Sequence, residues 1–316
     1  MKTITHWRKN IRIENYNCDI KRKKTKGFTL LELLVSIAII FLLLAIMMPL
    51  ANRARRGAVA SINMNNQRMI VIAVNSFAGD NGGRYPESAA TIGAENTWNW
   101  QEPTMMAACE KRNPKLMRSM SGYLQSYISN PGILFCPSAP KEYKYLKEMW
   151  LAGDDWDNPE TPWPQDSVIG NYCFYWNYAG SLEGRNKVFY GPAGQYSENG
   201  KSKLLVSDYF GFGHWRNKLI YEDCRAYGSC ERINSASVTP ATSVSSAFWS
   251  RWAGDANLPY NMQKIELHAA YIDGHVETYY SSDTIPIRVF QKADGTTPYP
   301  ADLGPGIFYL PEKALP

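Results

Sequence analysis

One carboxylate interrupts a long apolar segment near the N-terminus of this 316-residue chain. The segment GFTLLELLVSIAIIFLLLAIMMPL covers residues 27 to 50, and Glu32 lies close to its start. An ionised acid inside a membrane is costly unless it is partnered, so one reading of Glu32 is an ion pair with a cation. The other is an acid at a helix N-terminus that faces lipid head groups and is favoured by the helix macrodipole.

The histidines offer little catalytic chemistry. No HExxH, GxSxG, phosphate-binding loop or dinucleotide fingerprint occurs. The sequence DGH at residues 273–275 is best explained as a turn, and DNG at 80–82 has too few oxygen ligands to favour calcium over a helix end. We therefore predict no catalytic residue, no cofactor, no metal site and no enzymatic activity. The four histidines are His6, His214, His268 and His275.

Six cysteines are present, and Cys18 precedes the apolar segment. Among the others, Cys224 and Cys230 lie close together in a polar segment and are the candidates for a disulfide, which an exported domain permits. Zinc binding is disfavoured because no CxxC spacing occurs. The remaining cysteines are Cys109, Cys136 and Cys173, so at least one thiol outside the leader stays free or pairs with another chain.

Positive charge is concentrated at the N-terminus. Residues 1–27 hold nine Lys or Arg and two acidic residues, a net charge of +7, whereas the whole chain has only +5. A nearly neutral body argues against nucleic acid as a partner, because phosphate binding needs a concentrated positive face. The basic residues just before the apolar segment also favour a cytoplasmic N-terminus.

The apolar segment 28–50 predicts one membrane-spanning helix. It is long enough to reach about 34 Å, and the hydrocarbon core of a bilayer is about 30 Å thick. A buried helix of a soluble protein would show a polar face, and residues 37–48 have none. A cleaved signal peptide would have a shorter apolar core, and arginines crowd the far end of this one.

Residues 51–79 are expected to continue the same helix outside the membrane. A glycine-rich cluster at 79–83 should end it, and Pro49 should bend it near the outer leaflet. One apolar face is predicted from Val59, Ile62, Met69, Ile70, Val74 and Phe77. A polar set suited to water or neighbouring subunits is predicted from Arg53, Arg55, Arg56, Asn65, Asn66 and Gln67.

Residues 80–316 should form an extracytoplasmic head. Strands are predicted at 171–178, 203–209, 266–272 and 275–280, and the last two flank Asp273-Gly274, which suits a two-residue hairpin turn. A short helix is predicted within 105–127. The expected fold is therefore α+β: a long N-terminal helix packed on a mostly antiparallel sheet with long loops.

The stretch KGFTLLELL at residues 26–34 resembles the processing signature of type IV pilins and type II secretion pseudopilins. The resemblance implies that residues 1–27 are a basic leader, that a membrane prepilin peptidase cuts after Gly27, and that the new amine of Phe28 is methylated. Pro49 also stands where many members carry proline. Glu32 would then meet the ammonium of Phe28 from an adjoining copy, so that two buried charges neutralise each other.

Several head segments resemble a subgroup of pseudopilin-like proteins with a C-terminal Asp-Gly-His-Val element. They are DNGGRYP at 80–86, LFCPS at 134–138, NY at 171–172 and DGHV at 273–276. Many members also place a histidine nine residues before the Asp-Gly pair. That histidine is missing here, since the nearest one, His268, stands closer to the pair.

The expected function is a structural subunit of a type II secretion pseudopilus or a type IV pilus-like filament. It would be anchored in the inner membrane with the head outside, and its partners would be the peptidase, other pilin or pseudopilin subunits and lipid. The alternative is an anchored glycan-binding or hydrolytic protein, or one that grips a secreted cargo, because the head is rich in tryptophan. These residues are Trp98, Trp100, Trp150, Trp156, Trp163, Trp176, Trp215, Trp249 and Trp252.

Overall fold

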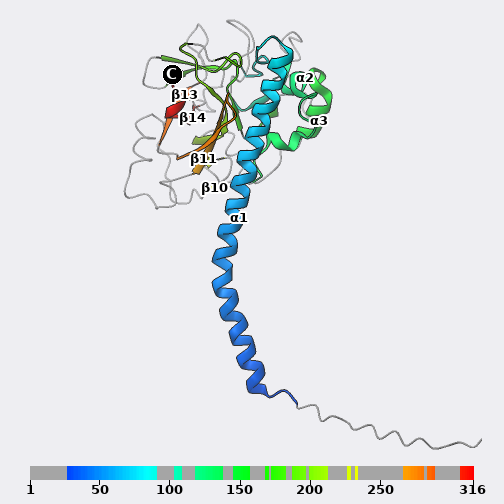
Figure 1. Cartoon of the computed structure of the whole chain (residues 1–316), viewed down its shortest axis with the longest axis vertical. Coiled ribbons are helices and arrows are strands. Elements are labelled where there is room, and N and C mark those ends of the chain that lie inside the picture. The colour runs from blue at the N-terminus through cyan, green and yellow to red at the C-terminus, as the bar shows by residue number, and fades with distance from the viewer. Residues whose placement is uncertain are drawn as a thin grey trace, which may run out of the picture. The chain divides into compact units, whose positions relative to one another are not determined.

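The chain divides into two compact units, Met1–Ala54 and Arg55–Pro316. The structure is a computed structural model (Figure 1). It describes residues 27–90, 103–108, 118–137, 145–156, 168–170, 172–182, 187–196, 199–212, 226–228, 232–233, 266–280, 283–288 and 307–316.

Helix α1 is 51 residues long and runs from Leu30 to Asp80, through Pro49. The prediction of one helix of about this length is confirmed. The helix ends where the backbone turns left-handed, with φ of +64° at Gly82 and +81° at Gly83. The N–H of Gly83 donates to the carbonyl of Ala78 at 2.7 Å, so the glycines satisfy a carbonyl that the helix itself leaves unpaired.

The remaining described elements form a head with antiparallel sheets and short helices, which confirms the predicted α+β fold. The sheet orders are β12-β11-β7-β4, β14-β13-β5-β6, β2-β1-β3 and β10-β9-β8, and the pairs are antiparallel. The strands are β1 (Met105–Ala108), β2 (Arg118–Ser119), β3 (Val168–Ile169), β4 (Tyr172–Phe174), β5 (Ala179–Leu182), β6 (Lys187–Tyr190), β7 (Leu204–Asp208), β8 (Phe210–Phe212), β9 (Ala226–Gly228), β10 (Arg232–Ile233), β11 (Glu266–Tyr271), β12 (Val276–Tyr280), β13 (Thr284–Arg288) and β14 (Ile307–Pro311). The short helices are α2 (Met120–Leu124), η2 (Pro131–Leu134), α3 (Leu146–Ala152), η3 (Gly153–Asp155) and η6 (Glu312–Ala314).

Two local predictions differ from the structure. Among the described residues of 105–127, β1 pairs with β2 and β3 and helix occurs over α2 alone, because long-range strand pairing overrides the local helical pattern at Met105–Ala108. The β11–β12 hairpin has a three-residue loop instead of two. Tyr271 N–H donates to His275 O, and Gly274, at φ +84°, donates to Tyr271 O, which is the geometry of a turn followed by a left-handed residue.

The outer half of α1 lies between the β12-β11-β7-β4 sheet and α2 (Figure 1). Its buried face differs from the predicted one. Ile70 and Val74 are buried as expected, but Ile62 and Met69 are 50% and 43% exposed. The buried residues on this face are Asn63, Asn66, Gln67, Ile70, Val71, Ala73, Val74 and Ala78. Of the polar set predicted to suit water or neighbouring subunits, Asn66 and Gln67 are buried, because the head supplies partners for them. Asn66 donates to the carbonyl of Phe135 at 3.3 Å, and Gln67 has its partner on the sheet.

That partner is chiefly the carboxylate of Asp208, the last residue of β7. Asn63 Nδ2 donates to both carboxylate oxygens, at 2.9 and 3.1 Å, and Gln67 Nε2 donates to Oδ1 at 2.9 Å. The backbone N–H of His268 donates to Oδ2 at 2.8 Å, and Tyr172 donates to Asn63 Oδ1 at 2.5 Å. Buried polar groups are tolerated where such partners exist, so the network fixes the register of the helix on the sheet.

The imidazole of His268 on β11 is part of the same buried network. Its Nδ1 lies 3.0 Å from Asp208 Oδ2 and 3.1 Å from Asn63 Nδ2, and a hydrogen bond to the carboxylate requires the hydrogen on Nδ1. Its buried Nε2 makes no hydrogen bond among the described residues, and Glu266 Oε1 lies 3.5 Å away. Burial lowers the pKa of His268, but the hydrogen bond and charge of Asp208, followed by those of Glu266, outweigh it and raise the pKa above its ordinary 6.5.

Replacing His268 tests this charge balance through the pH dependence of stability. Because the folded-state pKa is raised, protonated His268 contributes stability that is fully present below the unfolded pKa and is lost as pH rises through the folded value. The free energy of unfolding of the native protein should therefore fall relative to His268→Gln as pH rises from about 6 to about 8. Urea unfolding of the head, followed by tryptophan fluorescence, measures it.

The matched variant is Asp208→Asn, which keeps the histidine and removes the carboxylate. Burial then has the largest effect on the pKa of His268 and lowers it. The fall in the free energy of unfolding between about pH 6 and about pH 8 should therefore disappear or reverse. A native protein that gains stability over His268→Gln across this pH range would contradict the assignment.

Candidate processing and assembly site

The bond proposed for cleavage lies just before the start of helix α1. Residues 27–29 are non-helical and exposed, and Phe28 is 73% exposed. A Cβ added at Gly27 would meet no atom within 4 Å. The chain itself therefore accepts a larger residue at position 27, and any requirement for glycine there comes from the enzyme that must reach the backbone. The leader, residues 1–26, lies outside the described residues.

Thr29 and Glu32 form a reciprocal cap at the start of α1. Thr29 Oγ1 accepts from the backbone N–H of Glu32 at 3.2 Å, and the backbone N–H of Thr29 donates to Glu32 Oε2 at 2.9 Å. Thr29 Oγ1–H also donates to Oε2, at 2.8 Å. The pattern Thr-x-x-Glu is that of a capping box, in which the two side chains satisfy helix-end groups. Glu32 is thus already hydrogen-bonded within its own chain.

The cap uses one of the two carboxylate oxygens. Both donors reach Oε2, and among the described residues none donates to Oε1. A carboxylate accepts hydrogen bonds at each oxygen, so Oε1 remains available to a donor from another molecule. The first turn of the helix adds a favourable dipole for the negative charge. The arrangement holds Glu32 in a fixed place and leaves it able to accept from a cation.

The segment that follows is built to face lipid. Every residue from 28 to 50 is exposed, and α1 is the one helix among the described residues that is long and apolar enough to cross a membrane. Pro49 lacks an N–H and so leaves the carbonyl of Ala45 without its helical donor, yet the helix continues. Together with the motif reported below, the apolar helix suggests anchoring through a single span.

Sequence reasoning missed two features. The role of Thr29 was not predicted, although Thr-x-x-Glu before an apolar run is the signal for a capping box. The Asp208 network was also missed. Asn63 is 145 residues away from Asp208 in the chain, and no local pattern indicates that the two side chains meet.

The sequence singled out cysteines, the turn at Asp273–His275 and possible metal ligands in the head. Cys224 and Cys230 lie outside the described residues, while Cys136 and Cys173 are buried in the core. Asp273 Oδ1 accepts from the backbone N–H of His275 at 3.1 Å and contacts its Nδ1 at 2.5 Å, which fits the predicted turn. Among the described residues, no group of three or more His, Cys, Asp or Glu is placed to hold a metal ion.

The described tryptophans give no support to a sugar-binding surface. Trp150, Trp156 and Trp176 are 3%, 3% and 2% exposed and belong to the core. Rings that bind glycans by stacking must present a face to solvent, and these three do not. The other tryptophans named above lie outside the described residues.

Comparison with known proteins gives one finding. Residues 22–48 match the family model of the prokaryotic N-terminal methylation motif, a range that includes Gly27, Phe28 and Glu32. No curated protein and no solved structure gives a significant match to the chain. The chain therefore carries the N-terminal methylation motif, which supports a type IV pilin-like family.

Proposed function

We propose that this protein is a structural subunit of a type II secretion pseudopilus or a type IV pilus-like filament, with no enzymatic role. The observation that carries the proposal is the fixed position of Glu32 inside the matched motif, with Oε1 left available. A prepilin peptidase would cut between Gly27 and Phe28, and the new terminal amine would be methylated.

Cleavage supplies the cation that the acid lacks. It converts the peptide nitrogen of Phe28 into an ammonium, one residue before the capping threonine. When helices of adjoining copies stack with an offset, this ammonium reaches Glu32 of the neighbour. Two opposite charges in lipid then offset each other's desolvation cost, so that pairing stabilises one register of the stack above others.

The outer half of α1 offers a second contact for neighbouring helices. Ile62, Met69 and Ile72 are 50%, 43% and 49% exposed. Their spacings of seven and three residues place them on one helical face, opposite to the face that binds the sheet. Such a stripe suits helix–helix packing in a bundle.

The orientation follows from charge. Residues 1–27 carry a net charge of +7, and an excess of Lys and Arg beside a membrane span favours the cytoplasmic side. The leader would lie in the cytoplasm and the head outside the inner membrane. The filament would then be assembled from copies held in that membrane.

The mature N-terminus tests the processing step. Because the bond after Gly27 is exposed and the chain tolerates a side chain there, Gly27→Leu should fold normally and remain uncut, with its leader attached. Intact-mass and N-terminal peptide spectrometry of protein from cells that contain a prepilin peptidase measures this. Native protein should begin at N-methylated Phe28. A native protein that retains Met1 would contradict the proposal.

Replacing Glu32 with glutamine separates its two roles. Glutamine also completes a capping box, so the start of α1 should be unchanged, but the charge is gone. The precursor should still be cut, and filament yield should fall by roughly tenfold or more, because the ammonium of the neighbour stays unpaired in lipid. Immunoblots of sheared or cross-linked filaments measure the yield.

The matched control is Thr29→Val. It removes the threonine hydroxyl, at about 1 kcal/mol of helix stability, and keeps both the charge of Glu32 and the backbone N–H of residue 29 that donates to Oε2. This variant should therefore still assemble. If Glu32→Gln gave as many filaments as the native protein, the charge would not be needed for assembly.

A further inference from the structure

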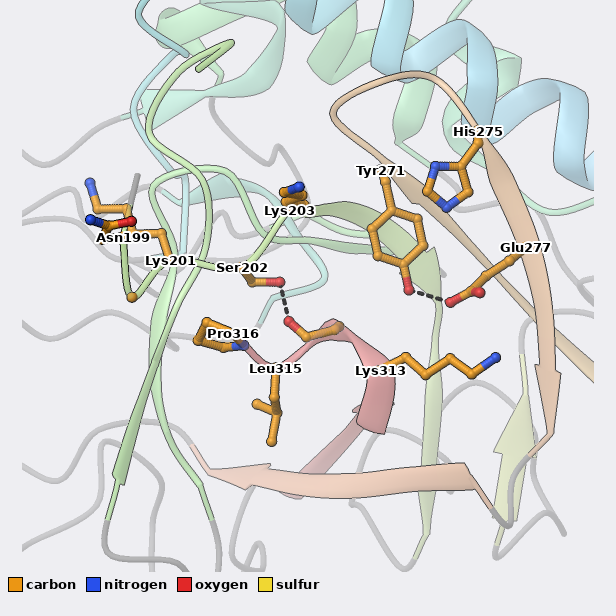
Figure 2. A pocket seen from close by; sticks show the side chains of 12 residues that line it. Asn199, Lys201, Ser202, Lys203, Tyr271, His275, Glu277, Lys313, Leu315 and Pro316 are labelled. Atoms are coloured by element: carbon orange, nitrogen blue, oxygen red, sulfur yellow. Dashed lines mark hydrogen bonds between the residues drawn. The ribbon is translucent and has the colours of Figure 1, made fainter. Parts of the chain in front are cut away.

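A pocket of about 440 Å³ opens on the head, and its lining contains none of the residues used for processing and assembly (Figure 2). Three segments that are distant in the sequence meet there: residues 199–203 before β7, the β11–β12 hairpin, and residues 313–316 at the end of the sequence. A volume of this size lies within the range of small-molecule sites in proteins.

The walls of the pocket are held by hydrogen bonds between these segments. Ser202 Oγ–H donates to the carbonyl of Ala314 at 2.5 Å, which ties residues 313–316 to the segment that leads into β7. The backbone N–H of Ile272 donates to the carbonyl of Lys203 at 3.0 Å, which ties in the hairpin. Ser202 and Ala314 are both 3% exposed, so the base of the pocket is fixed before any ligand arrives.

The lining is rich in positive charge. Lys201, Lys203 and Lys313 line the pocket from two of the three segments, and Glu277 is the one acidic side chain in the lining. Tyr271 donates its hydroxyl hydrogen to Glu277, so that carboxylate is already engaged. The ion pairs among the described residues involve neither Lys203 nor Lys313. Like charges gathered in one concavity raise the local potential for an anion.

An aromatic pair also lines the pocket. The rings of Tyr271 and His275 are stacked, with centroids 4.5 Å apart and planes 6° from parallel. The side chain of His275 is 54% exposed, and Figure 2 shows both rings near Glu277. The pocket therefore combines flexible cations with a rigid flat surface, which is the composition expected for a ligand with a charged group on a small organic body.

We propose that this pocket binds a small ligand bearing a carboxylate, sulfate or phosphate group. Lys203 and Lys313 contact the anion, and the Tyr271–His275 stack lies against the body of the ligand. Lysine is a point charge without the planar fork of arginine, so the recognition is of charge more than of one anion geometry. The site gives the head a binding function that is separate from filament assembly.

Titration calorimetry of the full-length protein in a neutral detergent tests the proposal. The probes are glucuronate, inorganic sulfate and inorganic phosphate, with glucose as the uncharged counterpart of glucuronate. We expect at least one anion to bind with a millimolar or tighter Kd and glucose not to bind. Lys203→Gln and Lys313→Gln should each weaken binding about threefold to fivefold, the range for partly exposed ion pairs. Raising NaCl from about 50 to 500 mM should weaken it further.

The matched control is Lys187→Gln, an exposed lysine of β6 that does not line the pocket and should leave the affinity unchanged. Thermal unfolding of each variant shows that the head remains folded. Tighter binding of glucuronate than of sulfate and phosphate assigns the ligand to acidic sugars, and the reverse order assigns it to inorganic or ester anions. The proposal is overturned if no anion binds below about 10 mM, if glucose binds as well as glucuronate, or if the two pocket variants match Lys187→Gln.

Discussion

A polar side chain that leaves water needs a partner, and both halves of helix α1 are organised by that requirement. In the apolar half, Glu32 accepts two hydrogen bonds from Thr29 through one carboxylate oxygen. In the outer half, Asn63 and Gln67 donate to the buried carboxylate of Asp208. The first arrangement leaves an acceptor available, whereas the second gathers its donors from several elements of the head. This difference suits the proposed pairing of Glu32 with another copy and an outer half that stays bound to its sheet.

The Asp208 network explains why polar residues occupy the helix face that binds the sheet. An apolar contact there would be satisfied by several offsets of the helix, because apolar packing has no direction. Hydrogen bonds from Asn63, Gln67 and Tyr172 are satisfied in one arrangement only. The buried carboxylate therefore specifies register, at the cost of requiring every partner to be present. The same carboxylate, with Glu266, raises the pKa of His268 and couples this region to pH.

Much of the fold was predictable because its signals are local. The helix was indicated by its apolar run and by the glycines after Asp80, and β7, β11 and β12 by short β-rich runs around turn residues. Strand β1, which begins at Met105, was not predicted, because its structure is decided by pairing with β2 and β3. Asn66 and Gln67 were expected, from residue type alone, to face water or neighbouring subunits, which is the correct default for a helix whose partner is unknown.

The functional residues also divide into those recognisable from a local motif and those brought together only by the fold. Gly27, Phe28 and Glu32 lie within a few residues of each other, so their relation was visible in the sequence and is the part that the family model matches. Thr29 was overlooked although its capping signal is equally local. The lysine pocket had no signal, because Lys203, Tyr271 and Lys313 come together only through the Ser202–Ala314 bond and the hairpin. A local motif can therefore be recognised in the sequence, whereas a pocket formed by tertiary contacts cannot.

The pairing of Glu32 with a neighbouring ammonium is tested most directly by zero-length cross-linking of assembled filaments. A carbodiimide joins a carboxylate to an amine only where the two are in contact, and proteolysis after Arg53 releases residues 28–53. Mass spectrometry should find two copies of this peptide joined by an amide between Glu32 and the Phe28 nitrogen. Only single copies of the peptide, while carboxylate–lysine cross-links form elsewhere in the same sample, would contradict the account.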